Sequence, residues 1–524
     1  METLTIGAPA PAAAPRYLAD KAVWLVAAAV FAAEMALSAR YGYVRDELYF
    51  LASGRHLALG GVDQPELTPL LARFDAVVTG NTLAGLRALP ALAFAVMVLL
   101  TASMARTLGA DRRGQLAAAV ATACCAEYLG AMHELTTTVP DFLCWTVALL
   151  LVTRLLASGD PRWWLAVGGA AGIGLAAKWN IGFLAAGLLL GFACTPAARP
   201  LLRSRYLAAG ALLAALLAAP DFGWQAAHGW PNFAVFHALQ QDAWSNRASY
   251  WPGQILYTSI VLVPLWVRGA AWSLRSARYR PLGIAAVAVI LAQFALGGKT
   301  YYPGGIYTFL FAAGGVAFTT GAGIARARFS AADSTGTAAT GTVTTGRSGP
   351  RPVLRLVALY CAAAAVCSVI SLPLLPAAAL ARFPVQKINY DLGEEIGWPA
   401  EVQLVAGVWH GLTPAQRART TLLAGNYGEA GAIDRYGPSL GLPAVYSGAN
   451  NFWLWGPPPA ADTAAIALGV DPAVLRREFT HVREIAVWNN GLGVSDDEQG
   501  TAVYLATGLR EAWAATWPAF RDYS

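Results

Sequence analysis

Charged residues are scarce in this chain of 524 residues. Only 13% of them are charged and 56% are hydrophobic, whereas about a quarter are charged in an ordinary soluble domain. The mean hydropathy is +0.46. This composition excludes an ordinary soluble protein and is typical of a polytopic membrane protein.

Recognisable metal and nucleotide motifs are also missing. The sequence holds no HxH, HExxH or DxD-type pattern. His133 and Glu134 could in principle join His228 or His237 around a divalent metal, but the spacing does not support one, and we expect no required cofactor. The segment LLAGNYGEAGAIDRYG has a turn that can offer backbone N–H groups to an anion, yet it lacks the GxGxxG spacing of a dinucleotide site.

Cysteine is rare and has no metal-site spacing. All six cysteines fall in apolar segments, which predicts small buried hydrophobic side chains. They are Cys124, Cys125, Cys144, Cys194, Cys361 and Cys367.

Long apolar runs are abundant instead. A bilayer crossing needs about 20 mostly apolar residues, and about eleven stretches qualify as candidate helices. Their centres lie near residues 30, 95, 123, 148, 170, 187, 213, 262, 290, 314 and 367. Alternate loops are rich in arginine, which by the positive-inside rule predicts a cytoplasmic N-terminus and an outer C-terminal region in a plasma (inner) membrane protein.

Three segments differ from this membrane part (residues 22–380). Residues 1–21 read as a cytoplasmic leader without the features of a cleavable signal peptide. Residues 329–350 are a Ser/Thr/Gly/Ala-rich stretch, predicted to be a disordered cytoplasmic linker. Residues 381–524 are long enough for a soluble extracytoplasmic domain with its own core.

The C-terminal segment alternates strand-like and helix-like stretches, which predicts a small α/β domain. TTLLAG, PAVYSG, AAIALGV and VREIAVW resemble strands, while PAQRAR, NYGEAGAIDRYG and DPAVLRREF resemble helices. This segment has 10 Lys/Arg against 15 Asp/Glu, so the net charge of +6 comes from the membrane part. Anionic lipid explains that basic excess, and we expect no nucleic-acid partner.

The stretch SGANNFWLWGPPP leaves two interpretations open. Asn450, Asn451, Trp453 and Trp455 can stack on and hydrogen-bond to a sugar. Alternatively, the aromatic residues anchor the domain on the membrane part or at the bilayer interface.

Polar residues gather in four loops that the topology places on the outer side, which favours a single site of chemistry. They are the first loop, residues 41–75, with Arg45, Asp46, Glu47, Arg55, His56, Asp63, Glu66, Arg73 and Asp75; the HELTTTVPD loop with His133, Glu134 and Asp141; residues 221–247 with Asp221, His228, His237 and Asp242; and GGKTYYPGG with Lys299, Tyr301 and Tyr302.

Asp46 is the first candidate for a general base toward a hydroxyl acceptor. Its neighbour Glu47 would raise its pKa and Arg45 would lower it, and the sequence leaves open which prevails. Equally open is whether Arg45 and Asp46 simply cap an interfacial helix.

Four cations can hold a phosphate: Arg45, Arg55, Lys178 and Lys299. The alternative for each is a snorkelling side chain at the interface. Glu34 and Glu127 lie within apolar segments, where an ionisable group is either functional or interfacial.

These motifs together resemble a known family. The loop YVRDELYFLASGRHLALGGVDQPELTPLLARF, the TxxPD segment at 137–141, AAKWN, and GKTYYPGGIYTFL resemble the GT-C membrane glycosyltransferases of family 39 type, the bacterial branch related to protein mannosyltransferases and the lipid A aminoarabinose transferase. The resemblance spans residues 22–325. Gly304, Gly305 and Glu66 depart from the usual residues.

The resemblance implies a GT-C fold and transfer of a sugar from a polyprenyl-phosphate donor to an acceptor on the outer face. It also implies catalytic roles for Asp46, with Glu47 beside it, and for Asp141. It places the segment with Lys299, Tyr301 and Tyr302 near the donor phosphate or at the cavity wall. The acceptor (lipid, glycan, protein or secreted small molecule) stays open. Membrane lipids are the other expected contacts.

Two other functions compete with transfer. A transporter or flippase commonly shows internal repeats and interrupted helices, and we find no convincing repeat. A non-catalytic assembly protein has no need of the charged first loop.

Overall fold

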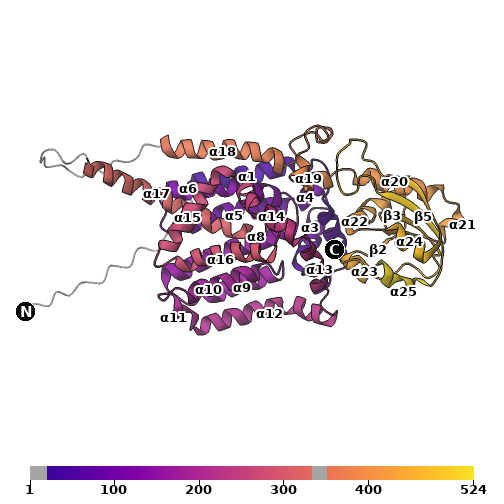
Figure 1. Ribbon diagram of the computed structural model, residues 1–524, viewed down its shortest axis with the longest axis horizontal. Coiled ribbons are helices and arrows are strands. Elements are labelled where there is room, and N and C mark those ends of the chain that lie inside the picture. The colour runs from indigo at the N-terminus through magenta and orange to yellow at the C-terminus, as the bar shows by residue number, and fades with distance from the viewer. Residues whose placement is uncertain (1–19, 333–350, 524) are drawn as a thin grey trace, which may run out of the picture.

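The computed structural model describes residues 20–332 and 351–523. A bundle of helices lies beside a smaller part that contains a five-stranded sheet (Figure 1). The predicted leader lies outside the described residues, apart from its last two. The predicted linker begins with residues 329–332, which belong to a helix, and the rest of it is outside the described range.

The bundle is formed by residues 21–371. Its helices are α1 (Lys21–Leu37), α2 (Arg45–Arg55), α3 (Leu67–Val78), α4 (Leu83–Leu86), α5 (Ala88–Thr107), α6 (Arg112–Ala123), α7 (Ala126–Ala131), α8 (Thr138–Ser158), α9 (Trp163–Leu175), α10 (Ile181–Ala193), α11 (Arg199–Leu202), α12 (Arg205–Ala227), α13 (Pro231–Leu239), α14 (Ala243–Tyr257), α15 (Val263–Arg275), α16 (Arg280–Leu296), α17 (Tyr307–Ala332) and α18 (Arg351–Ser371).

The predicted apolar centres all fall in helices or, near residue 262, in the short 3-10 turn between α14 and α15. Among the described residues, three helical spans are long and apolar enough to cross a membrane: Leu83–Thr107, Thr138–Ser158 and Arg205–Ala227. A bent pair, Pro231–Tyr257 and Ile260–Arg275, raises this to four at most. The other apolar helices are shorter, so the predicted number of about eleven crossings is not confirmed.

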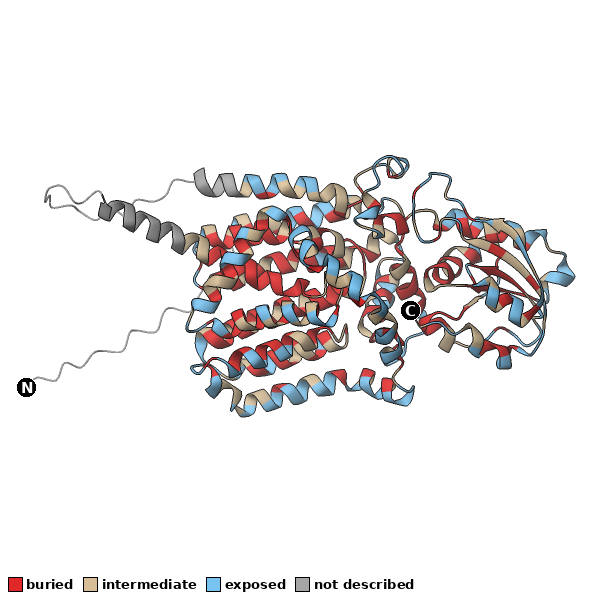
Figure 2. Cartoon of the chain, viewed as in Figure 1, coloured by how far each residue is buried: buried red, intermediate tan, exposed pale blue. Residues whose placement is uncertain are grey.

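Close backbone approach holds neighbouring helices together. α9 packs on α12, and a Cβ built on Gly168 would lie 2.1 Å from the carbonyl oxygen of Gly210. Any side chain at Gly168 would force these helices apart, as in other membrane bundles that pack through small residues. Figure 2 shows the resulting buried interior between the helices and the exposed outer face of α12.

Two expected loops are helical. The first loop folds into α2 and α3, and residues 221–247 continue α12 and then form α13 and the start of α14. Their polar residues had suggested surface loops. In the structure much of α2 is buried, including Leu48, Tyr49 and Phe50. The prediction that all six cysteines are buried is also wrong for three of them, because Cys194 and Cys361 are exposed on the protein surface and Cys367 is half-buried.

The C-terminal part is an α/β unit, as predicted. Its elements are α19 (Asp391–Glu394), α20 (Trp398–Gly411), α21 (Pro414–Arg417), β1 (Thr420–Ala424), α22 (Tyr427–Tyr436), β2 (Val445–Ser447), α23 (Asn450–Leu454), β3 (Ala464–Leu468), α24 (Pro472–Glu478), β4 (Phe479–Val487), β5 (Ala502–Leu509) and α25 (Trp513–Thr516). The strand order is β2-β1-β3-β5-β4. β1 runs parallel to β2 and β3, and β5 is antiparallel to β3 and β4.

One face of this sheet shares its core with the first loop. Leu48 and Tyr49 of α2 belong to the same buried cluster as Trp398, Ile433 and Leu422. α2 packs on α22, where a Cβ on Gly431 would come within 2.9 Å of the Leu48 backbone. Only the core on the other face of the sheet is formed by residues of the C-terminal part alone. The shared core on the first face holds α2 in place.

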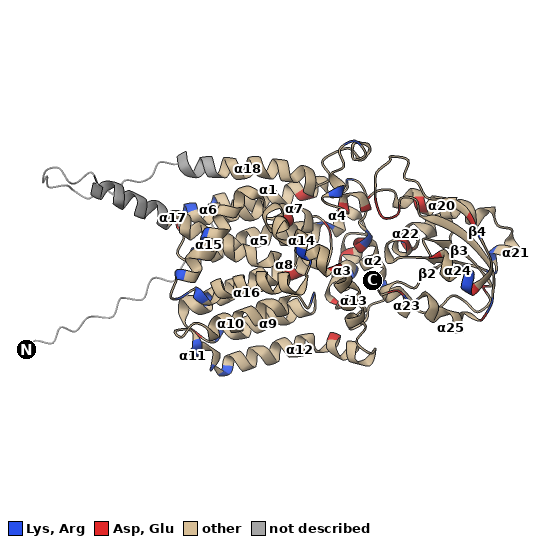
Figure 3. Cartoon of the chain, in the orientation of Figure 1, with Lys and Arg blue, Asp and Glu red and all other residues tan. Residues whose placement is uncertain are grey.

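Charge divides along the bundle. Lys and Arg gather at the end opposite the sheet, while many acidic residues lie where the bundle meets the sheet (Figure 3). The positive-inside rule predicts that the end rich in Lys and Arg is cytoplasmic, and the orientation of the termini in the membrane stays a prediction.

Candidate functional site

A cavity of about 340 Å³ lies beside the turn between α9 and α10, α13 and the segment that follows α16. It brings together three residues that the sequence predicts for binding: Lys178, Lys299 and Tyr302. Tyr301, another of the six residues predicted for binding, is adjacent, because the Lys178 Nζ lies 5.1 Å from the ring centroid of Tyr301 and 5.0 Å from that of Tyr302. We call this space the cation cavity.

The turn between α9 and α10 positions the cavity's polar wall. The side-chain amide of Asn180 donates to the Asp141 carboxylate (2.9 Å) and to the backbone carbonyl of Tyr302 (2.8 Å). Its own carbonyl oxygen accepts from Gln293 (2.9 Å). Asp141 also accepts from the Trp145 indole (2.9 Å). Asp141 is buried behind the wall and supports Asn180 without lining the cavity.

Electrostatics prepare the cavity for an anion. Burial lowers the pKa of Lys178, and the nearby charge of Lys299 adds to this effect. The carboxylates of Asp141 and, more weakly, Asp46 act in the opposite direction and raise that pKa. Two close cations in a low-dielectric site gain from a bound phosphate, which neutralises their repulsion.

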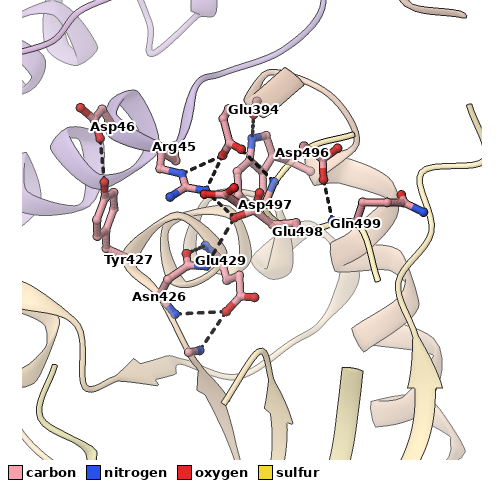
Figure 4. A network of polar contacts seen from close by, with 12 residues as sticks. Arg45, Asp46, Glu394, Asn426, Tyr427, Glu429, Asp496, Asp497, Glu498 and Gln499 are labelled. Carbon is pink, nitrogen blue, oxygen red and sulfur yellow. Dashed lines mark hydrogen bonds and ion pairs between the residues drawn. The ribbon is translucent and has the colours of Figure 1, made fainter. Parts of the chain in front are cut away.

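Asp46 stands at the N-terminal end of α2, half-buried beside the C-terminal part. The Tyr427 hydroxyl donates to its carboxylate (3.1 Å; Figure 4). Asp46 does not line the cation cavity, but its charge affects the pKa of Lys178 at the cavity wall. The charge of Asp46 also contributes, after burial and the neighbouring Tyr302, to raising the pKa of Tyr301.

Glu47 does not line the cation cavity, and its side chain contacts Arg87 instead. Its carboxylate is fully buried and accepts from Arg87 (2.9 and 3.1 Å) and from the backbone N–H groups of Val44 (3.1 Å) and Leu135 (3.2 Å). Both oxygens are used. The structure therefore does not bring Glu47 to the predicted site and gives it a structural contact instead.

The two predicted phosphate-binding arginines also face away from the cation cavity. Arg45 pairs with Glu394 (2.6 Å), Asp497 (3.0 Å) and Glu498 (3.1 Å) of the C-terminal part (Figure 4). Arg55 pairs with Asp434 on α22. Neighbouring residues on a helix point about 100° apart, so Arg45 and Asp46 reach different surroundings. Local sequence could not reveal these distant acidic residues.

The charge of Asp46 also acts on two carboxylates for which no individual role was predicted. Asp63 lines the cation cavity and accepts from the Tyr49 hydroxyl (2.7 Å), and burial raises its pKa to about 7. Burial and then the charge of Asp46 raise the pKa of Asp391 to about 7. Asp63 stood in the charged first loop and was therefore findable. Asp391 lies in the segment that leads to α20, and nothing in its sequence neighbourhood distinguished it.

The remaining candidates have local contacts. His133 Nδ1 lies 2.8 Å from a Glu34 oxygen, so Glu34 is part of a buried pair. Glu127 is buried beside Gly304. Among the described residues no group of three His, Cys, Asp or Glu side chains is arranged to hold a metal.

The glycine-bearing turn before α22 does not offer its N–H groups to an anion. Glu429 accepts from Gly425 (2.9 Å) and Asn426 (3.1 Å), so a carboxylate of the chain itself occupies that position (Figure 4). This outcome removes the anion-site interpretation of the turn.

An apolar groove of about 880 Å³ runs along α9, α10 and α12. It is lined largely by Ala, Gly and Leu residues, and Phe222 also lines it. Trp179 of the cation cavity stacks on Phe222 at 4.9 Å between ring centroids. The groove and the cation cavity therefore meet at this stack.

Comparison with known proteins agrees with the architecture. Residues 63–224 match the family described as dolichyl-phosphate-mannose-protein mannosyltransferase. ArnT from Cupriavidus metallidurans, solved bound to undecaprenyl phosphate, is similar over 92% of this chain and 97% of its own, with 17% identity and a TM-score of 0.55. Its apo structure is similar over the same shares, with 15% identity and a TM-score of 0.56. No curated protein matches the chain. The resemblance seen in the sequence is confirmed, and the fold is that of ArnT.

Proposed function

We propose, from the premise that this chain is related to the protein mannosyltransferases and has the GT-C fold of ArnT, that it transfers a sugar from a polyprenyl-phosphate donor to an acceptor hydroxyl. The reaction takes place at the outer face of the plasma membrane, with the C-terminal part outside. The observation that carries the proposal is the junction of a two-lysine cavity with an apolar groove.

This junction matches both halves of a lipid phosphate. Lys178 and Lys299 provide charge for the phosphate, and the Tyr301 and Tyr302 rings hold Lys178 in place. The groove offers apolar surface to an isoprenoid chain, whose burial is favourable along its whole length. A free sugar nucleotide or inorganic phosphate would leave the groove unused.

The reaction is a direct displacement. The acceptor oxygen forms a bond to the anomeric carbon while the bond from that carbon to the phosphate oxygen breaks, and its electron pair leaves with the phosphate. Asp46 accepts the acceptor's proton, a role worth about 10²–10⁴-fold in rate. The two lysines stabilise the charge that develops on the leaving phosphate.

Asp46 suits this role because it is half-buried and held by Tyr427. One base suffices for displacement with inversion, whereas a retaining mechanism requires a paired nucleophile. No residue is proposed for that second role.

The first test is binding of undecaprenyl phosphate to the protein in lipid nanodiscs. We expect Lys178→Met and Lys299→Met each to weaken binding about tenfold or more. Lys387→Met is the matched control, because Lys387 is exposed and lines neither cavity. Affinity for undecaprenyl phosphate equal to that of the wild type in all three variants would contradict the proposed phosphate site.

The second test is turnover. Polyprenyl-phosphate hexoses and pentoses are supplied together with a total envelope extract as the source of acceptor. Release of polyprenyl phosphate and labelling of an extract component support transfer. Donors that bind and stay intact in the presence of the extract would contradict transfer and favour a transporter.

A further inference from the structure

A second cavity of about 200 Å³ lies between the first-loop segment, the outer end of α12 and α23. Two stacked pairs form its walls. His56 lies on Trp455 at 4.2 Å between ring centroids, and Trp224 lies on His228 at 4.0 Å. The cavity shares Gln64 with the cation cavity, so the two lie side by side. We call it the aromatic cavity.

Its lining carries unsatisfied hydrogen-bonding groups. Ser53 Oγ, Gln64 Nε2 and Glu66 Oε2 are buried and make no hydrogen bond to the described residues. Ser53 and Gln64 are each 3% exposed. Buried polar groups in folded proteins nearly always find a hydrogen-bond partner. All three belong to residues that line the aromatic cavity, so a ligand that brings several hydroxyl groups would lie next to side chains that lack hydrogen-bond partners.

The two cavities differ in the charge of the residues that line them. The aromatic cavity is lined by the carboxylate of Glu66 but by neither Lys nor Arg among the described residues, whereas the cation cavity has two lysines. An anion would therefore go to the cation cavity. Aromatic faces together with donors and acceptors, in a space well below that of a drug-sized ligand, are complementary to one uncharged sugar ring.

We propose that the aromatic cavity is the acceptor subsite: it binds an uncharged sugar ring of the acceptor and directs one hydroxyl group toward the donor in the adjacent cation cavity. The proposal rests on the proposed function, since it concerns the second substrate of the same transfer. It implies that the acceptor is a glycan or a glycolipid with a terminal sugar.

The proposal also combines the two interpretations of SGANNFWLWGPPP. Asn451 accepts from the Val62 backbone N–H (2.8 Å), and Trp455 stacks on His56, so the stretch anchors the C-terminal part on the first-loop segment. The same two residues line the aromatic cavity. Anchoring therefore builds the sugar-binding wall.

The test measures sugar binding by the full chain in lipid nanodiscs, because many detergents carry sugar head groups. A panel of methyl glycosides of hexoses and pentoses serves as the probe, with dissociation constants from saturation-transfer NMR. We expect at least one glycoside to bind, and Glu66→Gln and Trp224→Ala each to raise its Kd about tenfold. Trp244→Ala is the matched control, since Trp244 is 80% exposed and lines neither cavity.

Two results would overturn the proposal. One is a panel with no binding to the wild type, and the other is a Kd unchanged in both Glu66→Gln and Trp224→Ala. Glu66→Gln nearly preserves the side-chain shape, so it remains informative if Trp224→Ala does not fold. Undecaprenyl phosphate binding is measured on the same samples, and its absence in the wild type would contradict the proposed function instead.

Discussion

Replacing each of the adjacent carboxylates Asp46 and Glu47 by its amide is expected to have opposite effects. Glu47→Gln should lower stability, whereas Asp46→Asn should lower turnover. Glu47 and Arg87 are 0% and 1% exposed and share two hydrogen bonds. Glu47→Gln leaves Arg87 with Glu395 (3.4 Å) as its paired carboxylate. Removing one member of a buried pair costs about 3–5 kcal/mol, a large part of the about 5–15 kcal/mol that stabilises a typical protein.

Asp46→Asn should lower the free energy of unfolding far less. Asn keeps an oxygen that can accept from Tyr427, so the loss is at most about 0.5–1.5 kcal/mol for one hydrogen bond. We therefore expect Asp46→Asn to fold like the wild type and to lose turnover by about 10²–10⁴-fold. Glu47→Gln should lose stability, and its remaining folded fraction should keep its activity.

The assay is thermal unfolding in nanodiscs, followed by turnover per folded molecule. The double variant Glu47→Gln/Arg87→Met serves as the control, because removing both charges should recover part of the lost stability. The reasoning would be refuted by a Glu47→Gln protein with the wild-type unfolding midpoint and no turnover, since that result would make Glu47 a residue of the reaction.

Three further predictions concern neighbouring contacts. Tyr427→Phe removes the hydrogen bond to Asp46 and should lower turnover severalfold with undecaprenyl phosphate affinity unchanged, as measured on the same samples. Gly431→Val should lower the unfolding midpoint markedly, because its side chain would collide with the Leu48 backbone; Gly407→Val, where the space is open, is the control. Burial raises the pKa of Asp63 to about 7, so its contribution to stability is fully present below its ordinary pKa and is lost as the pH rises through 7. Asp63→Asn should therefore unfold at a higher temperature than the wild type at pH 8, and this difference should vanish near pH 4; a constant difference would contradict the assignment.

The sequence was informative where local pattern governs structure. Short apolar strands between turn residues predicted β1 to β4, and the helices between them followed. β5 was missed because its sequence, AVYLATGL, sits in a long tail with no helix before it. α20 was also missed, since no element was predicted over its residues.

The structure brings some residues of the predicted site together and not others, for a similar reason. Lys178, Lys299, Tyr301 and Tyr302 come together because helix ends on one side of a bundle meet at one surface. The direction of the Arg45 side chain, by contrast, depends on ion pairs with carboxylates about 350–450 residues further along the chain. No local pattern reveals such distant contacts, and the same is true of Tyr427 at Asp46.

The most direct test of the central claim is release of polyprenyl phosphate under single-turnover conditions by wild type and Asp46→Asn, with the donor bound to equal occupancy and the envelope extract present. The account predicts that the wild type releases polyprenyl phosphate and that Asp46→Asn does so about 10²–10⁴-fold more slowly. Equal release by the two proteins would remove Asp46 from the reaction and contradict the account.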